Sequence, residues 1–454
     1  MPRAAAILLL GAVIAWGLRI TILEGFVYEW PRYFNGDFYA AMYDPVWWDG
    51  TGIMYGPVFV VERWLVDRWP HLFTIYLFAL ADIPAIGLAF VLGAAAARAG
   101  RTASLVALAA WLCFRWLYYA FSVAANPEIL ELLFLSLAWF AASRATPAVA
   151  WVAVALATLT KVIPAIFAPL LILRASRRAI IAWIVTGVAV VSAAGIAQRL
   201  SPQQLLSAII VPTQNKGGVS KRQAENIQPI PSMATYVGLN SALARAANLT
   251  DHDPSLVRVQ TATNVLTFLA YALSGLVVLR LLRGRHALPE VTRVALSYGL
   301  FFALMPLMTF NTHPHTFVFL LPAWTAIVAT LMEDNHRRRT TIFGVLFLLV
   351  YVFAGVPTVA VPLDRLLGTR FALSTPFADP IWADLALILS LSAYAVLRTR
   401  DVPAPPANHS PNDPGRSEDR RGLEKADGIQ RSEAGAPEAI SSSSPATTCQ
   451  YPTA

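Results

Sequence analysis

Apolar runs about twenty residues long recur along this chain from Ala4 to Arg398. A helix needs about 20 apolar residues to cross the roughly 30 Å hydrocarbon core of a bilayer. The chain is 56% hydrophobic and only 14% charged, which excludes a soluble multidomain enzyme. Because backbone groups in lipid must be hydrogen-bonded within the protein, we expect an all-α, polytopic membrane protein.

Basic residues fall at the ends of alternate apolar runs, in the pattern expected for loops on the cytoplasmic side of a membrane. The clusters are Arg98/Arg101, Arg144, Arg174/Arg177/Arg178, Arg280/Arg283/Arg285, Arg337/Arg338/Arg339 and Arg398/Arg400. This pattern predicts about twelve transmembrane or re-entrant helices, both termini in the cytoplasm and a multi-pass protein of the cell (inner or plasma) membrane. The predicted helices are 4–23, 71–96, 103–123, 128–142, 147–160, 162–174, 179–199, 258–282, 290–310, 316–333, 340–358 and 381–398.

Two of these helices, 147–160 and 162–174, are too short to span alone, so we predict a broken or re-entrant pair around Lys161 and Pro164. The topology leaves two long extracytoplasmic segments, 24–70 and 200–257, and the chemistry is expected on that side. The first of them includes an interfacial helix over Met54 to Trp69, where apolar and charged residues alternate at helical spacing.

The composition changes after Arg400, where Pro, Ser, Asn and mixed charges replace the apolar runs. We therefore predict two domains: a transmembrane domain over residues 1–400 and a disordered cytoplasmic tail over residues 401–454.

Asp37 lies about fourteen residues past the first predicted helix, in a segment that also holds Tyr39, Tyr43 and Trp47. A carboxylate beside aromatic rings suits a general base that acts on a sugar-bearing substrate. A helix cap or solvated acid, with an interfacial aromatic belt, is the alternative. The neighbouring acids Asp44 and Asp49 are typical of turns.

His315 and Lys161 are the candidate cations near helix ends. His313 and His315 could bind a metal only with further ligands, and a histidine that donates to a phosphate fits the sequence better. An interfacial histidine with no such task stays an alternative. Lys161 is a lone cation in an apolar stretch, which indicates a functional residue or a side chain that reaches the interface.

The second long segment is polar and cationic where the membrane topology favours few positive charges. Lys216, Lys221 and Arg222 are candidates to hold a phosphate, and Gly217-Gly218 would let the backbone approach it. A flexible, solvated loop is the alternative. No nucleotide-binding, zinc-protease or serine-hydrolase motif is present in the sequence.

Four pieces of sequence resemble the multispanning C-type glycosyltransferases, in particular glycosyltransferase family 87, which includes polyprenol-phosphate-mannose-dependent mannosyltransferases. They are the acid in GDFYAAMYD, the step Tyr55-Gly56-Pro57, the segment TKVIPAIFAPLLILR and the segment HPHTFVFLLPAW. The resemblance covers roughly residues 5 to 398.

The resemblance implies an inverting hexosyltransferase that moves a sugar, mannose in the family, from a polyprenol-phosphate donor to a lipid or glycan acceptor at the extracytoplasmic face. Asp37 would be the catalytic base. His315, Lys161, Asn226 and Gln228 would bind the donor, with Lys216, Lys221 and Arg222 as the phosphate-holding cations. Tyr39, Tyr43, Trp47 and Tyr55 would contact the acceptor or the sugar. No cofactor and no nucleic-acid partner is expected, and the metal requirement stays open.

Two other functions fit the same residues. A transporter or flippase of a lipid-linked sugar would share the helices, the cationic segment and Lys161. A lipid-pyrophosphate-dependent oligosaccharide ligase would also need cations and an extracytoplasmic histidine. The acid at Asp37 favours the glycosyltransferase over both.

Overall fold

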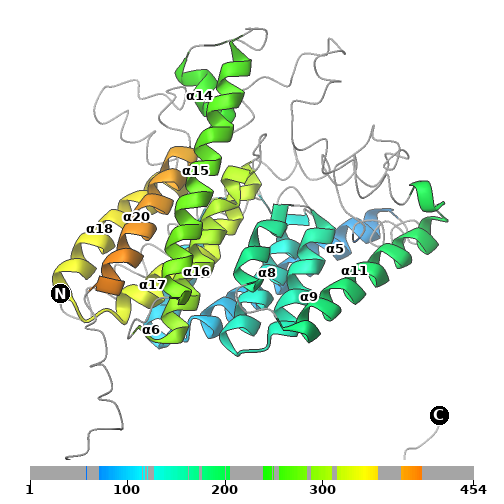
Figure 1. Cartoon of the computed structure of the whole chain (residues 1–454), viewed down its shortest axis with the longest axis horizontal. Helices are drawn as coiled ribbons and strands as arrows, with labels where there is room; N and C mark the ends of the chain where they lie inside the picture. Colours follow the sequence, from blue (N-terminus) through cyan, green and yellow to red (C-terminus); the bar gives the residue numbers. More distant parts are fainter. Residues whose placement is uncertain are drawn as a thin grey trace, which may run out of the picture. The chain divides into compact units, whose positions relative to one another are not determined.

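The computed structural model describes Val58 and residues 71–114, 116–117, 120, 127–161, 163–172, 176–199, 201–204, 239–247, 249, 255–283, 288–308, 314–355 and 380–400. All regular structure in these ranges is helical, as the apolar runs predicted (Figure 1). The contacts divide the chain into residues Met1–Pro403 and Ala404–Ala454, and all described residues belong to the first unit.

The helices follow the predicted runs closely. In chain order they are α5 (His71–Ala96), α6 (Arg101–Leu112), α8 (Pro127–Ser143), α9 (Pro147–Thr160), η2 (Ile163–Phe167), α10 (Ala168–Ile172), α11 (Arg177–Gln198), α14 (Leu239–Ala246), α15 (Leu256–Arg283), α16 (Glu290–Leu304), η4 (Pro306–Met308), η5 (Pro314–Phe319), α17 (Leu320–Met332), α18 (Arg337–Gly355) and α20 (Pro380–Arg400). The predicted helix 4–23 and interfacial helix 54–69 lie outside the described residues, apart from the helical Val58.

Four predicted helices differ from the observed ones, and one of these, 162–174, is divided into the 3-10 helix η2 and the short helix α10. The predicted helix 103–123 begins as α6, which ends at Leu112 with Cys113 as its cap, and the described residues Trp116, Leu117 and Ala120 beyond this interruption are helical again. The last turn of α6 is held by Trp111, whose Nε1 donates to Leu321 O and Thr325 Oγ1, both at 2.9 Å. The local sequence contains no signal for a helix end at Leu112.

The other two differences have local causes. The predicted helix 290–310 ends at Leu304 and continues as the 3-10 helix η4 from Pro306, because proline cannot continue the hydrogen-bond ladder. The predicted helix 316–333 begins as the 3-10 helix η5, which opens with Pro314. The short helix α14 lies in the segment that we predicted only as a long loop.

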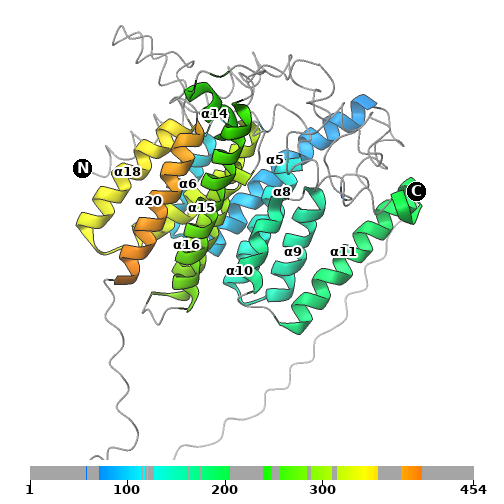
Figure 2. The ribbon, with the colours of Figure 1, turned by 45° about the horizontal axis from the view of Figure 1, so that its top comes forward.

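Two groups of helices pack side by side, as Figures 1 and 2 both show. One group holds α5, α8, α9 and α11, where α8 contacts α5 and α9, and α9 contacts α11. The other holds α15, α16, α17, α18 and α20. Contacts of α16 with α8 and of α17 with α5 join the groups, and α6 packs against α17. The two groups therefore share one core.

The centre of this core is aromatic and is built around α16. Phe302 packs edge-on against Phe167 with ring centroids 5.1 Å apart, and Tyr298 stacks on Trp139 at 6.3 Å. Gly299 lies against α17, where an added Cβ would be 3.2 Å from the Ala326 Cβ. Small residues at such crossings let helix backbones approach closely.

Four helices of the described chain are long and apolar enough to cross a membrane. They cover Arg177–Ala197, Val257–Arg283, Glu290–Met308 and Pro380–Thr399. Several helices present large apolar side chains outward, including Ile184 and Val188 of α11, Phe268 of α15 and Phe353 of α18. Contiguous exposed apolar faces fit helices that face lipid.

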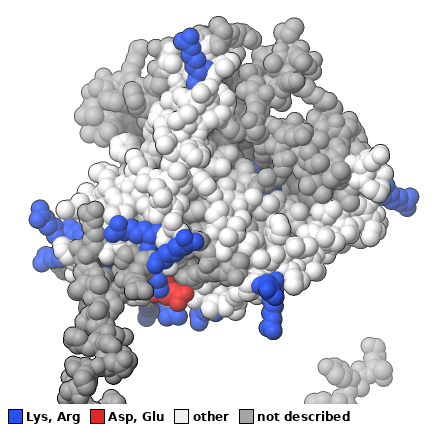
Figure 3. Space-filling view, in the orientation of Figure 1, with Lys and Arg blue, Asp and Glu red and all other residues white. Residues whose placement is uncertain are grey.

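Lys and Arg side chains gather mainly along one edge of the molecule, seen at the lower edge of Figure 3. We call this the arginine-rich end and define it by the residues that flank the helices there: Arg98, Arg101, Arg144, Arg177, Arg178, Arg280, Arg283, Arg337, Arg338, Arg339 and Arg398. Arg199 and Arg258 lie at the other ends of α11 and α15. We call that side the opposite end.

Candidate functional site

Most of the predicted site residues lie outside the part of the chain that the structure describes. They are Asp37, Tyr39, Tyr43, Trp47, Tyr55, Lys216, Lys221, Arg222, Asn226 and Gln228. Their roles stay predictions. The chain of residues 24–70 joins the start of α5, and the chain of residues 205–238 runs between α11 and α14. Both segments are therefore attached to the opposite end of the bundle.

The break at Lys161 is confirmed. Helix α9 ends at Thr160, and Lys161 has an extended backbone with φ −153° and ψ 142°. The Lys161 N–H still donates to Ala157 O at 3.1 Å, which closes the last turn of α9. Pro164 then lies in η2, which lacks the regular α-helical ladder. The chain thus turns at the opposite end without a long loop.

Lys161 forms a buried ion pair with Glu128. The Glu128 side chain is 0% exposed and the Lys161 side chain 10% exposed. Glu128 is in the first turn of α8, where the helix dipole stabilises a negative charge. The extended backbone at Lys161 and the start of α8 therefore bring two distant residues together. Lys161, a predicted donor-binding residue, thus has a carboxylate partner within the protein.

A second buried acid lies beside this pair in sequence. Glu131 is 0% exposed and follows Glu128 by three residues on α8, so both carboxylates lie on one face of the helix. Sequence reasoning did not select Glu131. The signal was the pattern PEILELLF, in which two acids at helical spacing interrupt an otherwise apolar helix.

The segment that carries His315 packs against the same helix. His315 belongs to η5, and η5 contacts both α8 and α17. Phe317 of η5 is fully buried and its ring lies 5.8 Å from that of Trp116. The structure therefore brings together the elements that carry Lys161, Glu128 and His315, while the His315 side chain lies outside the description.

A hydrogen-bonded charge cluster lies at the arginine-rich end. The Asp334 carboxylate accepts from Arg339 Nε at 2.6 Å and Arg339 Nη2 at 2.7 Å, and it lies 3.0 Å from Arg398 Nη1. The Tyr394 hydroxyl lies 3.2 Å from Asp334 Oδ2. Burial alone would raise the pKa of Asp334, but the hydrogen bonds from Arg339 and the His336 N–H, with the charges of Arg398 and Arg339, hold that pKa well below its usual range.

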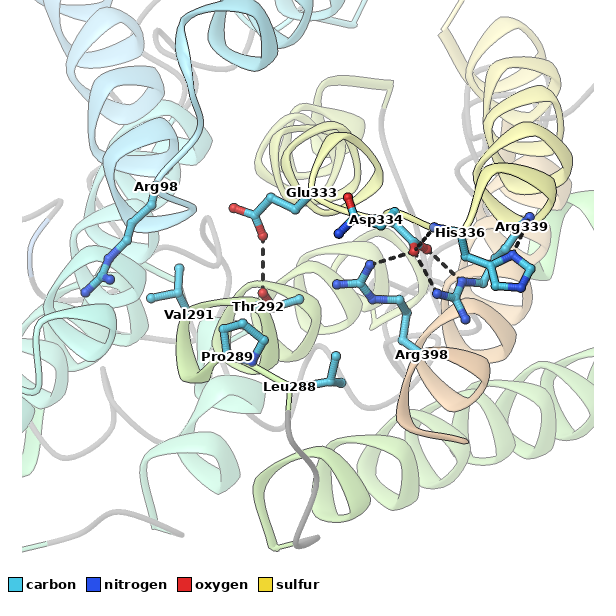
Figure 4. Close-up of a pocket in the computed structure, with 11 residues that line it drawn as sticks. Arg98, Leu288, Pro289, Val291, Thr292, Glu333, Asp334, His336, Arg339 and Arg398 are labelled. Carbon is cyan, nitrogen blue, oxygen red and sulfur yellow. Dashed lines mark hydrogen bonds and ion pairs between the residues drawn. The ribbon is translucent and has the colours of Figure 1, made fainter. Parts of the chain in front are cut away.

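A cavity of about 790 Å³ opens beside this cluster, as Figure 4 shows. Its wall comes from the turn after α5, the start of α16, the turn between α17 and α18, and the end of α20. Arg98 and Arg398 lie on different sides of it, and Thr292 donates to Glu333 Oε2 at 3.2 Å between them. We expected the chemistry at the opposite end, so this cavity was not predicted.

One further buried acid was missed. Asp384 of α20 is 0% exposed, and neither carboxylate oxygen has a hydrogen-bond partner among the described residues. It is a single acid in the apolar run IWADLALILS, which is itself a signal in a membrane helix. The described residues hold no group of three or more His, Cys, Asp or Glu arranged to bind a metal ion.

The fold and the buried charges define a helical bundle with several helices fit to cross a membrane and ion pairs at both ends. No family model matches the chain, and a search of curated proteins finds no match to it.

Proposed function

We propose that the protein is a multispanning C-type glycosyltransferase with about twelve transmembrane or re-entrant helices. It moves a sugar from a polyprenol-phosphate donor to a lipid or glycan acceptor at the extracytoplasmic face of the cell membrane. The observation that carries the proposal is the buried Lys161–Glu128 pair at the chain break. Glu128 is on α8, and α8 also packs against η5, the segment that bears His315. These features lie at the end to which both long predicted loops are attached.

The charge pattern supports the proposal that the reaction takes place on the extracytoplasmic side of the membrane. Basic residues in short loops favour the cytoplasmic side, which assigns the arginine-rich end to the cytoplasm. The opposite end, with the Lys161 break, is then extracytoplasmic. A lipid-borne donor in the outer leaflet would reach that end from the side, and no nucleotide-binding domain is needed there.

Asp37 is the proposed general base. It accepts the proton of the acceptor hydroxyl as the hydroxyl oxygen attacks the anomeric carbon of the sugar. The bond from that carbon to the phosphate oxygen breaks, and the lipid phosphate leaves as an anion. A single displacement of this kind inverts the anomeric centre.

Lys221, Arg222 and His315 are the proposed donor-phosphate residues, with Lys216, Asn226 and Gln228 as further contacts. Cations near the leaving phosphate stabilise the negative charge that develops on it. Lys161 is already neutralised by Glu128, so its proposed role is to hold the break between α9 and η2 in place rather than to supply an unpaired charge. The aromatic residues Tyr39, Tyr43, Trp47 and Tyr55 are the proposed contacts to sugar or acceptor.

The proposal is tested with the purified full-length protein, reconstituted with a membrane lipid extract and incubated with polyprenol-phosphate mannose, glucose or arabinose. The product mass identifies the donor and the reaction class. We expect Asp37→Asn to lower turnover by at least a hundredfold while donor binding stays measurable, because general-base catalysis contributes about 10²- to 10⁴-fold.

Asp44→Asn is the matched control, since it makes the same chemical change seven residues later at a predicted turn. It should keep most of the wild-type turnover. Undiminished turnover in Asp37→Asn would remove the base assignment. Movement of the lipid-linked sugar across the membrane without any new glycoside would favour the flippase instead.

A further inference from the structure

The cavity at the arginine-rich end has the features of a binding site that the proposed sugar transfer does not use. It lies where α16 begins and α20 ends, and both helices belong to the four that are long and apolar enough to cross a membrane. The ends of membrane-spanning helices lie at the depth of the lipid headgroups. A ligand in this cavity would therefore be at the level of a headgroup.

The charge balance of the cavity wall is positive. Asp334 is held by both Arg339 and Arg398, so this group of three carries one net positive charge. Arg398 is 7% exposed, and its Nε has no hydrogen-bond partner in the part of the chain that the structure describes. Arg98 adds an exposed cation on the other side of the cavity.

The start of α16 adds backbone donors to this wall. Pro289 is the N-cap residue and provides no side-chain hydrogen bond to the first turn. Leu288, Pro289, Val291 and Thr292 all line the cavity, so the positive end of this 15-residue helix borders it, while the first-turn acid Glu290 is not part of the lining. A helix N-terminus together with arginine side chains is an arrangement that favours phosphate.

The remaining acid of the wall limits which phosphate compound fits. Glu333 accepts a hydrogen bond from Thr292 and lies between the two sides of the cavity in Figure 4. A carboxylate there disfavours a bare phosphate but can accept a hydrogen bond from a hydroxyl or ammonium group. The complementary ligand is a phosphodiester that carries such a donor a few atoms away.

We propose that this cavity binds the headgroup of a phospholipid, with the phosphodiester between Arg98, Arg398 and the start of α16, and a headgroup hydroxyl or ammonium donating to Glu333. Its volume of about 790 Å³ is within the range of small-molecule sites, about 300–1,000 Å³. The site is independent of Asp37 and of the opposite end, so it can be tested whether or not the protein transfers sugar.

The test measures binding of short-chain phosphatidylglycerol to the purified full-length protein in detergent, by native mass spectrometry. Short-chain phosphatidylcholine, whose headgroup has no hydrogen-bond donor, is the comparison lipid, and glycerol phosphate is the soluble comparison. We expect phosphatidylglycerol to bind more tightly than both. Arg98→Gln should weaken its binding about fivefold, the effect of one arginine near a membrane surface.

Arg144→Gln is the matched control, because Arg144 is exposed at the same end and packs on Phe140, outside the cavity. It should leave binding unchanged. Equal losses for Arg98→Gln and Arg144→Gln would overturn the site, and binding of glycerol phosphate as tight as that of the lipid would overturn the lipid assignment.

Discussion

Lys161 lies at the break after α9 and forms an ion pair with Glu128, which is 33 residues away in the sequence. Both side chains are largely out of solvent, and each charge stabilises the other. Burying an ion pair adds little net stability, but leaving one charge without the other is costly. The pair therefore fixes the position of the break more than it strengthens the fold.

Removal of one member of this pair should destabilise the protein. We expect Lys161→Met to lower the free energy of unfolding by about 3 kcal/mol, because Glu128 then stays buried without its cation. The double variant Lys161→Met with Glu128→Gln should recover much of that loss. Heat denaturation of the purified protein in detergent measures both, with Arg144→Gln as an exposed-charge control. A double variant less stable than the single one would contradict this account.

At the scale of single helices, the sequence was most informative where an apolar run is bounded by proline or basic residues. The predicted helices 71–96 and 147–160 have the same bounds as α5 and α9. The break after Thr160 was also predicted, since Lys161 and Pro164 interrupt the apolar run. Helix α6 is interrupted at Cys113, within the predicted run, and the contact of Trp111 with α17 beside this interruption is one that no local pattern reveals.

The crossing of α16 with α17 depends on Gly299. A Cβ at this position would lie 3.2 Å from the Ala326 Cβ and 3.5 Å from Leu391 Cδ2, and the Ala326 side chain has no rotamer that moves it away. We expect Gly299→Val to lower the free energy of unfolding by about 1–3 kcal/mol through overpacking. Gly344→Val is the control, since nothing lies within 4 Å of a Cβ there. Similar heat-denaturation curves for the two variants would show that the crossing is not tight.

At the scale of the whole molecule, the gathering of arginines at one end predicts an orientation in the membrane (Figure 3). Asn335 is exposed in the turn between α17 and α18 at the arginine-rich end, and Ser201 is exposed beyond α11 at the opposite end. From the positive-inside rule we expect Asn335 in the cytoplasm and Ser201 outside.

Single cysteines at these two positions test the orientation, in a background where Cys113 and Cys449 are replaced by serine. A membrane-impermeant maleimide added to intact cells should label Ser201→Cys and should reach Asn335→Cys only after permeabilisation. Detergent-solubilised protein should be labelled at both positions, which controls for reactivity. The reverse pattern in intact cells would invert the topology and move the proposed reaction to the other side.

The sequence by itself determined the class of structure and the order of its helices. The length of an apolar run and the basic residues beside it are local features, and they decide whether that segment can form a helix in a bilayer. It also marked Lys161 as a candidate functional residue. Only the tertiary structure decided that Lys161 pairs with Glu128, and that Arg98, Arg398 and the start of α16 surround one cavity. Those contacts join residues far apart in the chain. Their pairing depends on how the helices pack against one another, and the residue pattern of a single helix carries no information about that packing.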